Sequence, residues 1–274
     1  MSNERQRVPA CLAIAGSDSG GGAGIQADLK AFARCGVHGM TAITALTAQN
    51  TVGVEMVVAV APEMIVAQIE AVASDIGVDA VKIGMLADAT TIEAVVAGLH
   101  LLDEVPIVVD PVMVSESGAT LLDPNARAAL IERILPWATV ATPNIPEARA
   151  LCRLGSGATQ EQLAEAVRAL GPEAVVVTGG HAPDGAGADV VADKQGTIRI
   201  EGPRYSDGAA HGSGCTHSSS LAAFLARGAE LADAARWARE VAADAVGNGL
   251  REIGQGAGPV DVFGLARRGA TVGG

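Results

Sequence analysis

A glycine-rich segment with a cysteine, residues 210–217, carries the residue types best suited to chemistry in this chain. It reads Ala-His-Gly-Ser-Gly-Cys-Thr-His, and the apolar run 221–225 predicts that this loop enters a helix. The first N–H groups of a helix lack internal partners and lie at the positive end of its dipole, so they hold phosphate or developing negative charge. Gly212 and Gly214 permit positive φ and close approach of an anion. The same field is expected to lower the pKa of Cys215, which would then serve as a base on a substrate hydroxyl.

The segment also fits a simpler interpretation, with an ordinary loop and N-cap and with Cys215 as a small buried side chain. Chemistry is favoured because further polar segments follow predicted strands along the chain. Ligands of open parallel sheets bind at the carboxyl ends of the strands, so these segments are expected to meet at one edge. They are the glycine loop 16–24, Gln49-Asn50, Gly84-Met85, Asp110-Pro111 and Thr142-Pro143-Asn144.

Two carboxylates in or near these segments are candidates for a metal site. Asp110 follows the apolar run 107–109, and an aspartate at a strand end can hold Mg²⁺ directly or through water. An Asx turn before Pro111 is the alternative. Glu147 lies at a predicted helix start beside Asn144, where it either binds a metal-bound water or only satisfies the helix dipole.

Other side chains suit a flat nitrogen heterocycle. The amide of Gln49 both donates and accepts, which fits a ring edge, or it stabilises a loop. The polarizable sulfur of Met85 can pack on a ring or belong to the core. The glycine loop lacks the spacing of a dinucleotide fingerprint but allows the backbone to wrap around a small ligand. Asp28, one turn into the first helix, faces either that ligand or solvent.

Short aliphatic runs alternate with amphipathic stretches and must position these residues. The predicted strands are 11–15, 40–44, 54–60, 80–83, 107–109, 139–141 and 174–178, with a β-hairpin of 190–192 and 197–200. The predicted helices are 25–35, 63–74, 90–101, 125–134, 147–153, 160–170, 215–227 and 231–247. Apolar strands separated by helices indicate an α/β fold whose parallel sheet is covered on both faces.

The totals exclude several classes of partner. Aromatic residues are only 2%, so a surface of rings for base stacking is not expected. The net charge of −12 argues against nucleic acid and membrane as partners, but not against a phosphate held by N–H groups and Mg²⁺. Four scattered cysteines, the absence of an apolar leader and strand-sized apolar runs predict a reduced, cytoplasmic protein. One domain is expected over 10–268, with flexible ends at 1–9 and 269–274.

These segments together resemble the hydroxymethylpyrimidine/phosphomethylpyrimidine kinases of thiamine biosynthesis, in the ribokinase-like superfamily. The resemblance runs from about Ala10 to Phe263. Its most specific stretches are Gly-Ser-Asp-Ser-Gly-Gly-Gly-Ala-Gly-Ile-Gln-Ala-Asp-Leu-Lys at 16–30 and Ala-Ile-Thr-Ala-Leu-Thr-Ala-Gln-Asn-Thr at 42–51. Residues 254–260, Gly-Gln-Gly-Ala-Gly-Pro-Val, match the family's C-terminal glycine segment.

The resemblance implies a three-layer α/β/α sandwich with a mostly parallel central sheet, usually as a homodimer. It implies that ATP and Mg²⁺ are used to phosphorylate 4-amino-5-hydroxymethyl-2-methylpyrimidine and then its monophosphate. Carried over by position, it implies a pyrimidine pocket formed by Gly16, Ala23, Asp28, Gln49, Met85 and Val112. It implies metal ligands at Asp110 and Glu147, and nucleotide or phosphate contacts at Asn144, Glu147, Thr178 and Gly180. It implies an anion hole of Gly212, Ser213 and Gly214, with Cys215 as general base.

The chain departs from the family pattern where it touches phosphate. Thr178, before Gly179-Gly180-His181, and Gln255 stand where the family usually has lysine, and Ala210 and Ser213 where it has threonine. The missing lysines predict weak ATP binding unless another cation compensates. Lys194, Arg199 and Arg251 are the candidates.

Two other functions stay open at this point. One is a pyridoxal or pyridoxine kinase of the same superfamily, because both rings are flat nitrogen heterocycles bearing a hydroxymethyl group. The other is a pyrimidine-binding regulator that kept the fold and lost catalysis, which the missing lysines suggest. The retained Asp110, Glu147 and Cys215 argue against the regulator, because a pure binder does not need a metal and base set.

Overall fold

The computed structural model describes residues 7–123, 125–180, 187–203, 205 and 209–269. The described chain contains one sheet with the order β3 (Val54–Ala59), β2 (His38–Gln49), β1 (Ala10–Asp18), β4 (Ala80–Ile83), β5 (Ile107–Val109), β6 (Val140–Ala141), β7 (Ala174–Val177), β8 (Asp189–Asp193) and β9 (Gly196–Ile200). From β2 to β7 in that order the neighbours are parallel, and β3, β8 and β9 pair antiparallel. The mostly parallel sheet is therefore confirmed, and its carboxyl ends share one edge.

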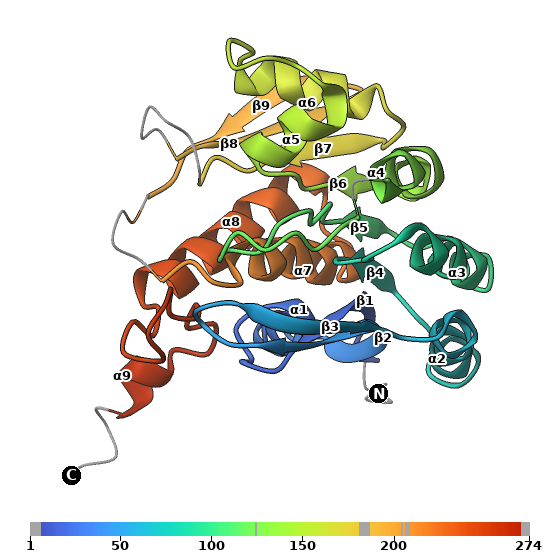
Figure 1. Cartoon of the computed structure of the whole chain (residues 1–274). Coiled ribbons are helices and arrows are strands. Elements are labelled where there is room, and N and C mark those ends of the chain that lie inside the picture. The colour runs from blue at the N-terminus through green and yellow to red at the C-terminus, as the bar shows by residue number, and fades with distance from the viewer. Residues whose placement is uncertain (1–6, 124, 181–186, 204, 206–208, 270–274) are drawn as a thin grey trace, which may run out of the picture.

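Helices cover both faces of the sheet, which gives three layers (Figure 1). One layer contains α2 (Pro62–Asp75), α3 (Ala89–Leu99), α4 (Ala126–Ala129), α5 (Ile145–Cys152) and α6 (Gln160–Arg168). The other contains α1 (Gly24–Arg34), α7 (Ser213–Ala226) and α8 (Leu231–Gly247). Side chains alternate between them, because Leu12 and Ile14 of β1 pack in the first core, whereas Cys11 and Ala13 pack in the second.

Several predicted elements lie where expected, among them the strands 80–83 and 107–109 and the helix 231–247. The predicted helix 125–134 is divided, because α4 continues as a π-helical turn, Leu130–Ile134, and then a 3₁₀ turn, Leu135–Trp137. The short helix α9 (Leu265–Gly269) was not predicted. Strand β3 has no buried residue, because it forms an antiparallel edge of the sheet rather than part of its covered centre.

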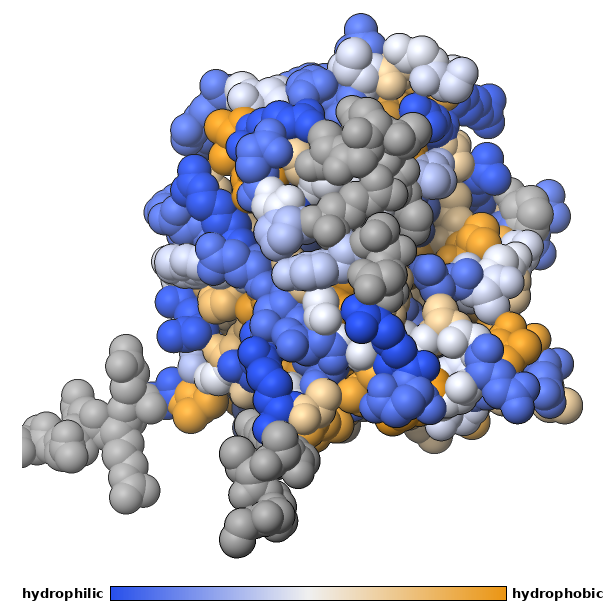
Figure 2. Space-filling model, turned by 90° about the vertical axis from the view of Figure 1, so that its left-hand side faces the viewer, coloured by the Kyte–Doolittle hydropathy of each residue, from blue (hydrophilic) through white to orange (hydrophobic). Residues whose placement is uncertain are grey.

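The remaining observations concern the two ends of the chain, its surface and whether its helices could span a membrane. Residues 1–6 and 270–274, where flexible ends were predicted, lie outside the described residues, while Arg7 is paired with Asp79 at 3.2 Å. Figure 2 shows a face on which hydrophilic residues predominate and hydrophobic ones form small separate groups. Within the described chain, every helix is too short or too polar to cross a bilayer.

Candidate active site

A cavity of about 290 Å³ opens at the carboxyl edge of the sheet, between the strand ends and the start of α7. Among the predicted site residues, its lining includes Gly16, Ala23, Gln49, Met85, Asp110, Val112, Asn144, Glu147, Thr178, Gly180, Gly212, Ser213, Gly214 and Cys215. Asp28 is the exception. The structure therefore brings the polar segments to one place, as expected for the carboxyl ends of parallel strands.

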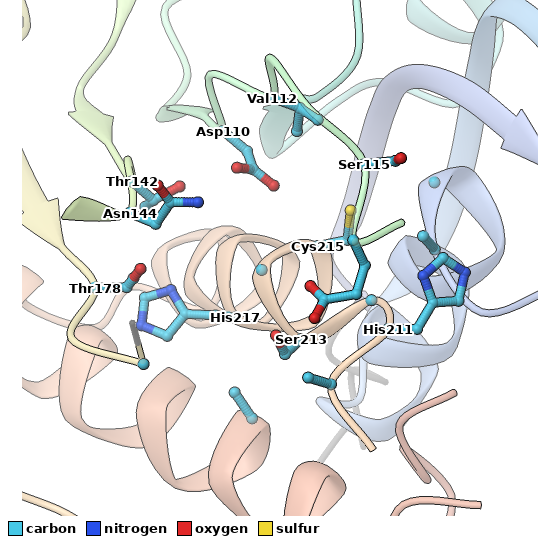
Figure 3. A pocket seen from close by; sticks show the side chains of 18 of the residues that line it. Asp110, Val112, Ser115, Thr142, Asn144, Thr178, His211, Ser213, Cys215 and His217 are labelled. Atoms are coloured by element: carbon cyan, nitrogen blue, oxygen red, sulfur yellow. The ribbon is translucent and has the colours of Figure 1, made fainter. Parts of the chain in front are cut away.

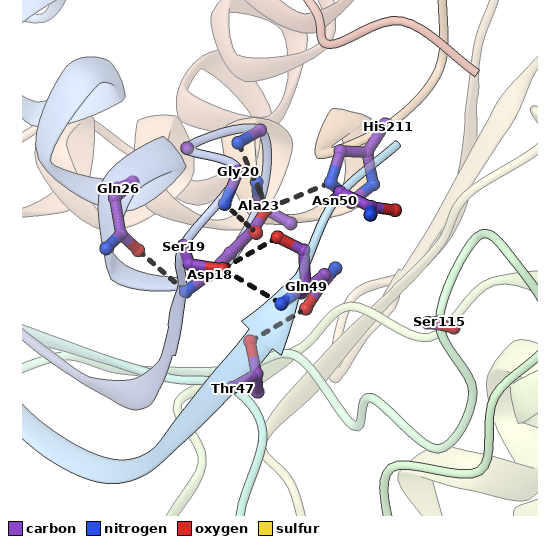
Figure 4. A network of polar contacts seen from close by, with 12 residues as sticks. Asp18, Ser19, Gly20, Ala23, Gln26, Thr47, Gln49, Asn50, Ser115 and His211 are labelled. Atoms are coloured by element: carbon purple, nitrogen blue, oxygen red, sulfur yellow. Dashed lines mark hydrogen bonds and ion pairs between the residues drawn. The ribbon is translucent and has the colours of Figure 1, made fainter. Parts of the chain in front are cut away.

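Asp18 organises the glycine loop at one end of the cavity (Figure 4). Its Oδ1 accepts a hydrogen bond from the Gly20 N–H at 2.8 Å, and its Oδ2 accepts from the N–H groups of Gly22 and Ala23. Oδ2 also lies 2.9 Å from Nε2 of His211. Burial alone would raise the pKa of Asp18, but His211 and the loop N–H groups lower it below its usual value. Asp18 therefore ties the glycine loop to the segment that leads into α7.

The segment into α7 begins with a glycine in the left-handed region. Gly212 has φ of 88°, and a Cβ there would collide with the carbonyl oxygen of Gly22. Gly214, for which positive φ was anticipated, lies inside the first turn of the helix, so only Gly212 requires that freedom. The N–H groups that follow Gly212 border the cavity at the positive end of a 14-residue helix.

Cys215 lies in the first turn of α7, but its thiol does not have the predicted low pKa. Burial raises the pKa of Cys215 to about 12, and the carboxylates of Asp28 and Asp110 add to this. Lys82 and a hydrogen bond with the Gly24 backbone act in the lowering direction but do not prevail. The expectation that the helix field lowers the pKa of Cys215 was wrong, because desolvation of the sulfur outweighs the favourable field.

Behind the cavity lies a fully buried ion cluster that the sequence analysis did not identify. Nζ of Lys82 on β4 lies 2.9 Å from Oδ1 of Asp28 on α1 and 3.7 Å from Oδ2 of Asp110. Ser219 of α7 donates to the same oxygen of Asp28, and Ser218 donates to Asp110. Burial would lower the pKa of Lys82, but the two carboxylates raise it well above its usual value, so the amine is charged. Lys82 itself lines the cavity.

This cluster changes the position expected for Asp28. Its side chain is fully buried and faces neither the loop ligand nor solvent. A carboxylate at that depth is stable only with a paired charge, which Lys82 supplies. Asp28 therefore supports the site from behind, through Lys82, instead of lining the pocket.

Two further carboxylates line the cavity, Asp110 directly after β5 and Glu147 in the first turn of α5. Asn144 and Glu147 form a capping box at the start of α5, with Oδ1 of Asn144 2.8 Å from the Glu147 N–H and Oε2 of Glu147 2.9 Å from the Asn144 N–H. Burial, followed by the charge of Asp110, raises the pKa of Glu147 to about 8. Figure 3 shows Asp110 pointing into the cavity near Thr142 and Asn144.

The donor set of this pair fits Mg²⁺. No cluster of three or more His, Cys, Asp or Glu side chains in the described chain is arranged to hold a metal alone. Mg²⁺ commonly takes one or two carboxylates and completes its shell with water and substrate phosphates. Mutual repulsion of Asp110 and Glu147 is a further reason for a cation there, because a divalent ion would remove it.

The acceptor end of the cavity combines an amide with apolar groups. The backbone N–H of Gln49 donates to Oγ of Ser19. The side-chain Oε1 of Gln49 accepts a hydrogen bond from the Thr47 hydroxyl at 3.1 Å, which orients the side-chain amide (Figure 4). Met85 packs over Gly16, where a Cβ would lie 3.0 Å from the Met85 sulfur. Gly16, Gln49, Met85 and Val112 all line the cavity, so this part of it combines apolar groups with one side-chain amide.

The opposite end contains a second polar cluster that sequence reasoning missed. Asp189 accepts hydrogen bonds from Nη1 of Arg239 at 2.7 Å and from the Gly179 N–H at 2.9 Å, and lies 3.3 Å from Nε2 of His217. Burial would raise the pKa of Asp189, but His217, Arg239 and the Gly179 N–H lower it below its usual value. Figure 3 shows His217 beside Thr178, whereas Ser115 and His211 lie at the other end.

The cations expected to compensate for the missing lysines are placed elsewhere. Arg199 forms exposed ion pairs with Glu161 and Glu201, and Lys194 lies in the exposed turn between β8 and β9. Neither they nor Arg251 is among the described lining residues, whereas Arg239 is. His181, which follows Gly180 in the sequence, lies outside the described residues. In the sequence, Arg239 stands out only as a basic residue among the alanines of the predicted helix 231–247.

Comparison with known proteins agrees with this geometry. Residues 18–261 match the family model described as phosphomethylpyrimidine kinase. The hydroxymethylpyrimidine/phosphomethylpyrimidine kinase of Rhizobium meliloti is 48% identical over 258 residues, 92% of this chain and 96% of the relative. That of Escherichia coli is 41% identical over 256 residues, 92% of this chain and 96% of the relative.

Solved structures place the fold in the same group. A Bacillus subtilis pyridoxal kinase in complex with ADP has a TM-score of 0.85 at 36% identity and covers 95% of this chain and 99% of its own. The phosphomethylpyrimidine kinase of Clostridium difficile 630 has a TM-score of 0.77 at 38% identity, with 88% and 100% covered. The fold is therefore ribokinase-like. By sequence and structure alike, this chain belongs to the phosphomethylpyrimidine kinase family.

Proposed function

We propose that this protein uses ATP to phosphorylate 4-amino-5-hydroxymethyl-2-methylpyrimidine and then its monophosphate. The observation that carries the proposal is the single cavity, which joins an oriented amide and an apolar floor to a cysteine, helix N–H groups and a carboxylate pair. Relatives named for both kinase activities support it over nearly the whole chain.

The acceptor end supplies orientation. The amide of Gln49 would read the ring edge, while Met85 and Val112 would pack on its faces. This pose directs the hydroxymethyl group toward Cys215 and the N–H groups after Gly212. Phosphoryl transfer depends mainly on such alignment and on charge neutralisation, so a rigid cavity supplies much of the rate enhancement.

The helix N-terminus supplies charge stabilisation. N–H groups of Ser213, Gly214 and Cys215 would meet the equatorial oxygens of the transferring phosphoryl group. Asp110 and Glu147 would hold Mg²⁺, which would neutralise negative charge on the phosphates during the transfer. Lys82 keeps the Asp110 carboxylate in place from behind.

Cys215 would accept the proton of the substrate hydroxyl, although burial raises the pKa of its thiol to about 12. Occupation of the carboxylate pair by a divalent cation would cancel the effect of Asp110, one of the groups that raise this pKa, while Lys82 continues to lower it. The substrate hydroxyl loses its proton late in the reaction, because phosphoryl transfer proceeds through a loose transition state.

Product identification by mass spectrometry tests the function. The protein is incubated with ATP, Mg²⁺ and the hydroxymethylpyrimidine, and both the mono- and the diphosphate are expected. Cys215→Ala should lower kcat about 100-fold or more, with a small change in pyrimidine binding. Equal turnover of the two proteins would remove the base assignment, and absence of pyrimidine product would remove the function.

A second candidate, pyridoxal kinase, is favoured by one observation. The pyridoxal kinases of Staphylococcus aureus and Bacillus subtilis superpose with TM-scores of 0.85, above the 0.77 of the C. difficile enzyme. The same assay with pyridoxal decides the matter. Phosphopyridoxal as the only product would make this the main activity.

We also propose a homodimer formed through the exposed edge of the sheet. Met56 and Val58 on β3 are 63% and 54% exposed, and Leu46 on β2 is 52% exposed. Apolar side chains on an open edge strand are typical of an interface. Light scattering of Met56→Lys should show a monomer if β3 forms the contact.

The four free cysteines support a reducing, cytoplasmic location.

A further inference from the structure

The imidazole of His217 is buried at the edge of the cavity without hydrogen bonds. The residue is 4% exposed, and neither Nδ1 nor Nε2 has a hydrogen-bond partner within the described chain. Nε2 lies 3.3 Å from Oδ2 of Asp189, which is close enough for an ion pair but not aligned as a hydrogen bond. Burying a polar ring without hydrogen bonds costs free energy, unless a ligand supplies the missing partners.

The neighbouring charges show what such a ligand would need. Arg239 lines the cavity, but its guanidinium is engaged by Asp189 at 2.7 Å and by the Gly187 carbonyl. One arginine and one aspartate leave this cluster without net charge. Asp189 is thus already neutralised by Arg239, and the unpartnered His217 ring can offer an N–H to the cavity that it lines. A ligand with a negatively charged oxygen fits such a donor.

The position of the ring identifies the anion's place in the site. His217 is two residues beyond Cys215 on α7, and in Figure 3 it lies beside Thr178 and across from Asp110. Figure 3 shows Cys215 between His217 and His211. Gln49 belongs to the His211 end, because Gln49 bonds to Ser19 and His211 contacts the neighbouring Asp18. A group at His217 thus lies on the donor side of the transferred phosphoryl group.

We infer that His217 binds a phosphate oxygen of the nucleoside triphosphate donor, with Asp189 and Arg239 holding its ring in place. This deepens the proposed function and rests on it. In the bound complex the Nδ1–H donates to the phosphate, while Nε2 stays beside Asp189. A hydrogen bond to a charged phosphate oxygen is stronger than a neutral one. His217 thereby supplies a donor at the phosphates, since neither Lys194 nor Arg199 is among the described residues that line the cavity.

Nucleotide binding to variants tests the inference. His217→Leu fills the space without a donor, and we expect the KM for ATP to rise about tenfold or more, while the KM for the pyrimidine changes little. Calorimetry should show weaker binding of ATP but unchanged binding of adenosine, which has no phosphates. His38→Leu, at the exposed start of β2 on the opposite edge of the sheet, is the matched control and should behave as the wild type.

A second substitution tests the charge itself. Thr178 borders the cavity next to His217, so Thr178→Lys places an ammonium group in the same region. In the His217→Leu background it should restore most of the lost ATP affinity. A ring with only a structural role would not be replaced by a charge from another strand. If His217→Leu fails to fold, His217→Gln keeps a polar contact to Asp189 without charge and should show the same loss of ATP affinity.

The outcomes separate this inference from the function. A wild type that makes no phosphorylated product with either acceptor overturns the proposed kinase activity. An active wild type whose His217→Leu variant has an unchanged KM for ATP overturns the inference alone. Equal losses of ATP and adenosine binding would also overturn it, because they would show a general disturbance of the nucleotide site.

Discussion

Replacement of Lys82 by methionine should destabilise the protein strongly. The change keeps the apolar stem but removes the charge between two carboxylates, Asp28 at 2.9 Å and Asp110 at 3.7 Å. Asp28 would keep only the Ser219 hydroxyl, because its Oδ2 already has no hydrogen-bond partner. Loss of one partner from a buried pair costs about 3–5 kcal/mol, a large part of a typical stability of about 5–15 kcal/mol.

Urea denaturation followed by circular dichroism measures the cost. With a slope of about 3 kcal/mol per molar urea, the midpoint of Lys82→Met should fall by about 1–1.7 M. Asp28→Asn is the matched variant, since it leaves Lys82 with Asp110 as its remaining carboxylate. The double variant should be more stable than the sum of the single losses predicts, with a coupling of about 1–3 kcal/mol. A cost below 1 kcal/mol for Lys82→Met, or strict additivity, would refute the reasoning.

Three further predictions follow from the site. Because burial raises the pKa of Cys215 to about 12, iodoacetamide at pH 7.5 should alkylate Cys152, which is half-buried like Cys215, well before Cys215, and peptide mass spectrometry that found the reverse order would contradict this. Glu147 has a folded pKa of about 8 against 4.5 for the free side chain, so without metal it lowers the free energy of unfolding as pH rises from about 4.5 to 8. Glu147→Gln should remove that decline, and an unchanged pH profile in thermal unfolding would contradict it. Gly212→Ala should cost at least 1–2 kcal/mol because of its positive φ, whereas Gly214→Ala, helical and with open space at its Cβ, should not destabilise; equal melting temperatures would contradict this.

The sequence predicted the sheet and the meeting of its polar segments because those features depend on local patterns. Aliphatic runs mark the strands, and parallel pairing sends every strand end to one edge. The division of the helix after Asn125 depends on how α4 packs, which periodicity does not encode. The exposed β3 likewise follows from its position at the end of the sheet, since its composition resembles that of a covered strand.

The electrostatics of the site could be predicted only in part. The helix start favoured a low pKa for Cys215, but the depth of the sulfur, which only the fold defines, reverses the result. Lys82 did give a signal, as the single charge in a strand of four buried residues. His217 gave less, because its partner Asp189 precedes it by 28 positions and belongs to another element. Long-range partners of this kind require the three-dimensional arrangement.

The contact between Asp18 and His211 has a consequence for the order in which the protein becomes active. The two residues are 193 positions apart, one at the end of the first strand and the other just before α7. Closing so large a loop is slow, and its entropy cost is offset by favourable contacts only when the intervening sheet has formed. A chain still emerging from the ribosome can therefore build most of its sheet, yet its glycine loop lacks a partner until the last helices arrive. Ligand binding by this protein should report completion of folding, with no partial activity in shorter products.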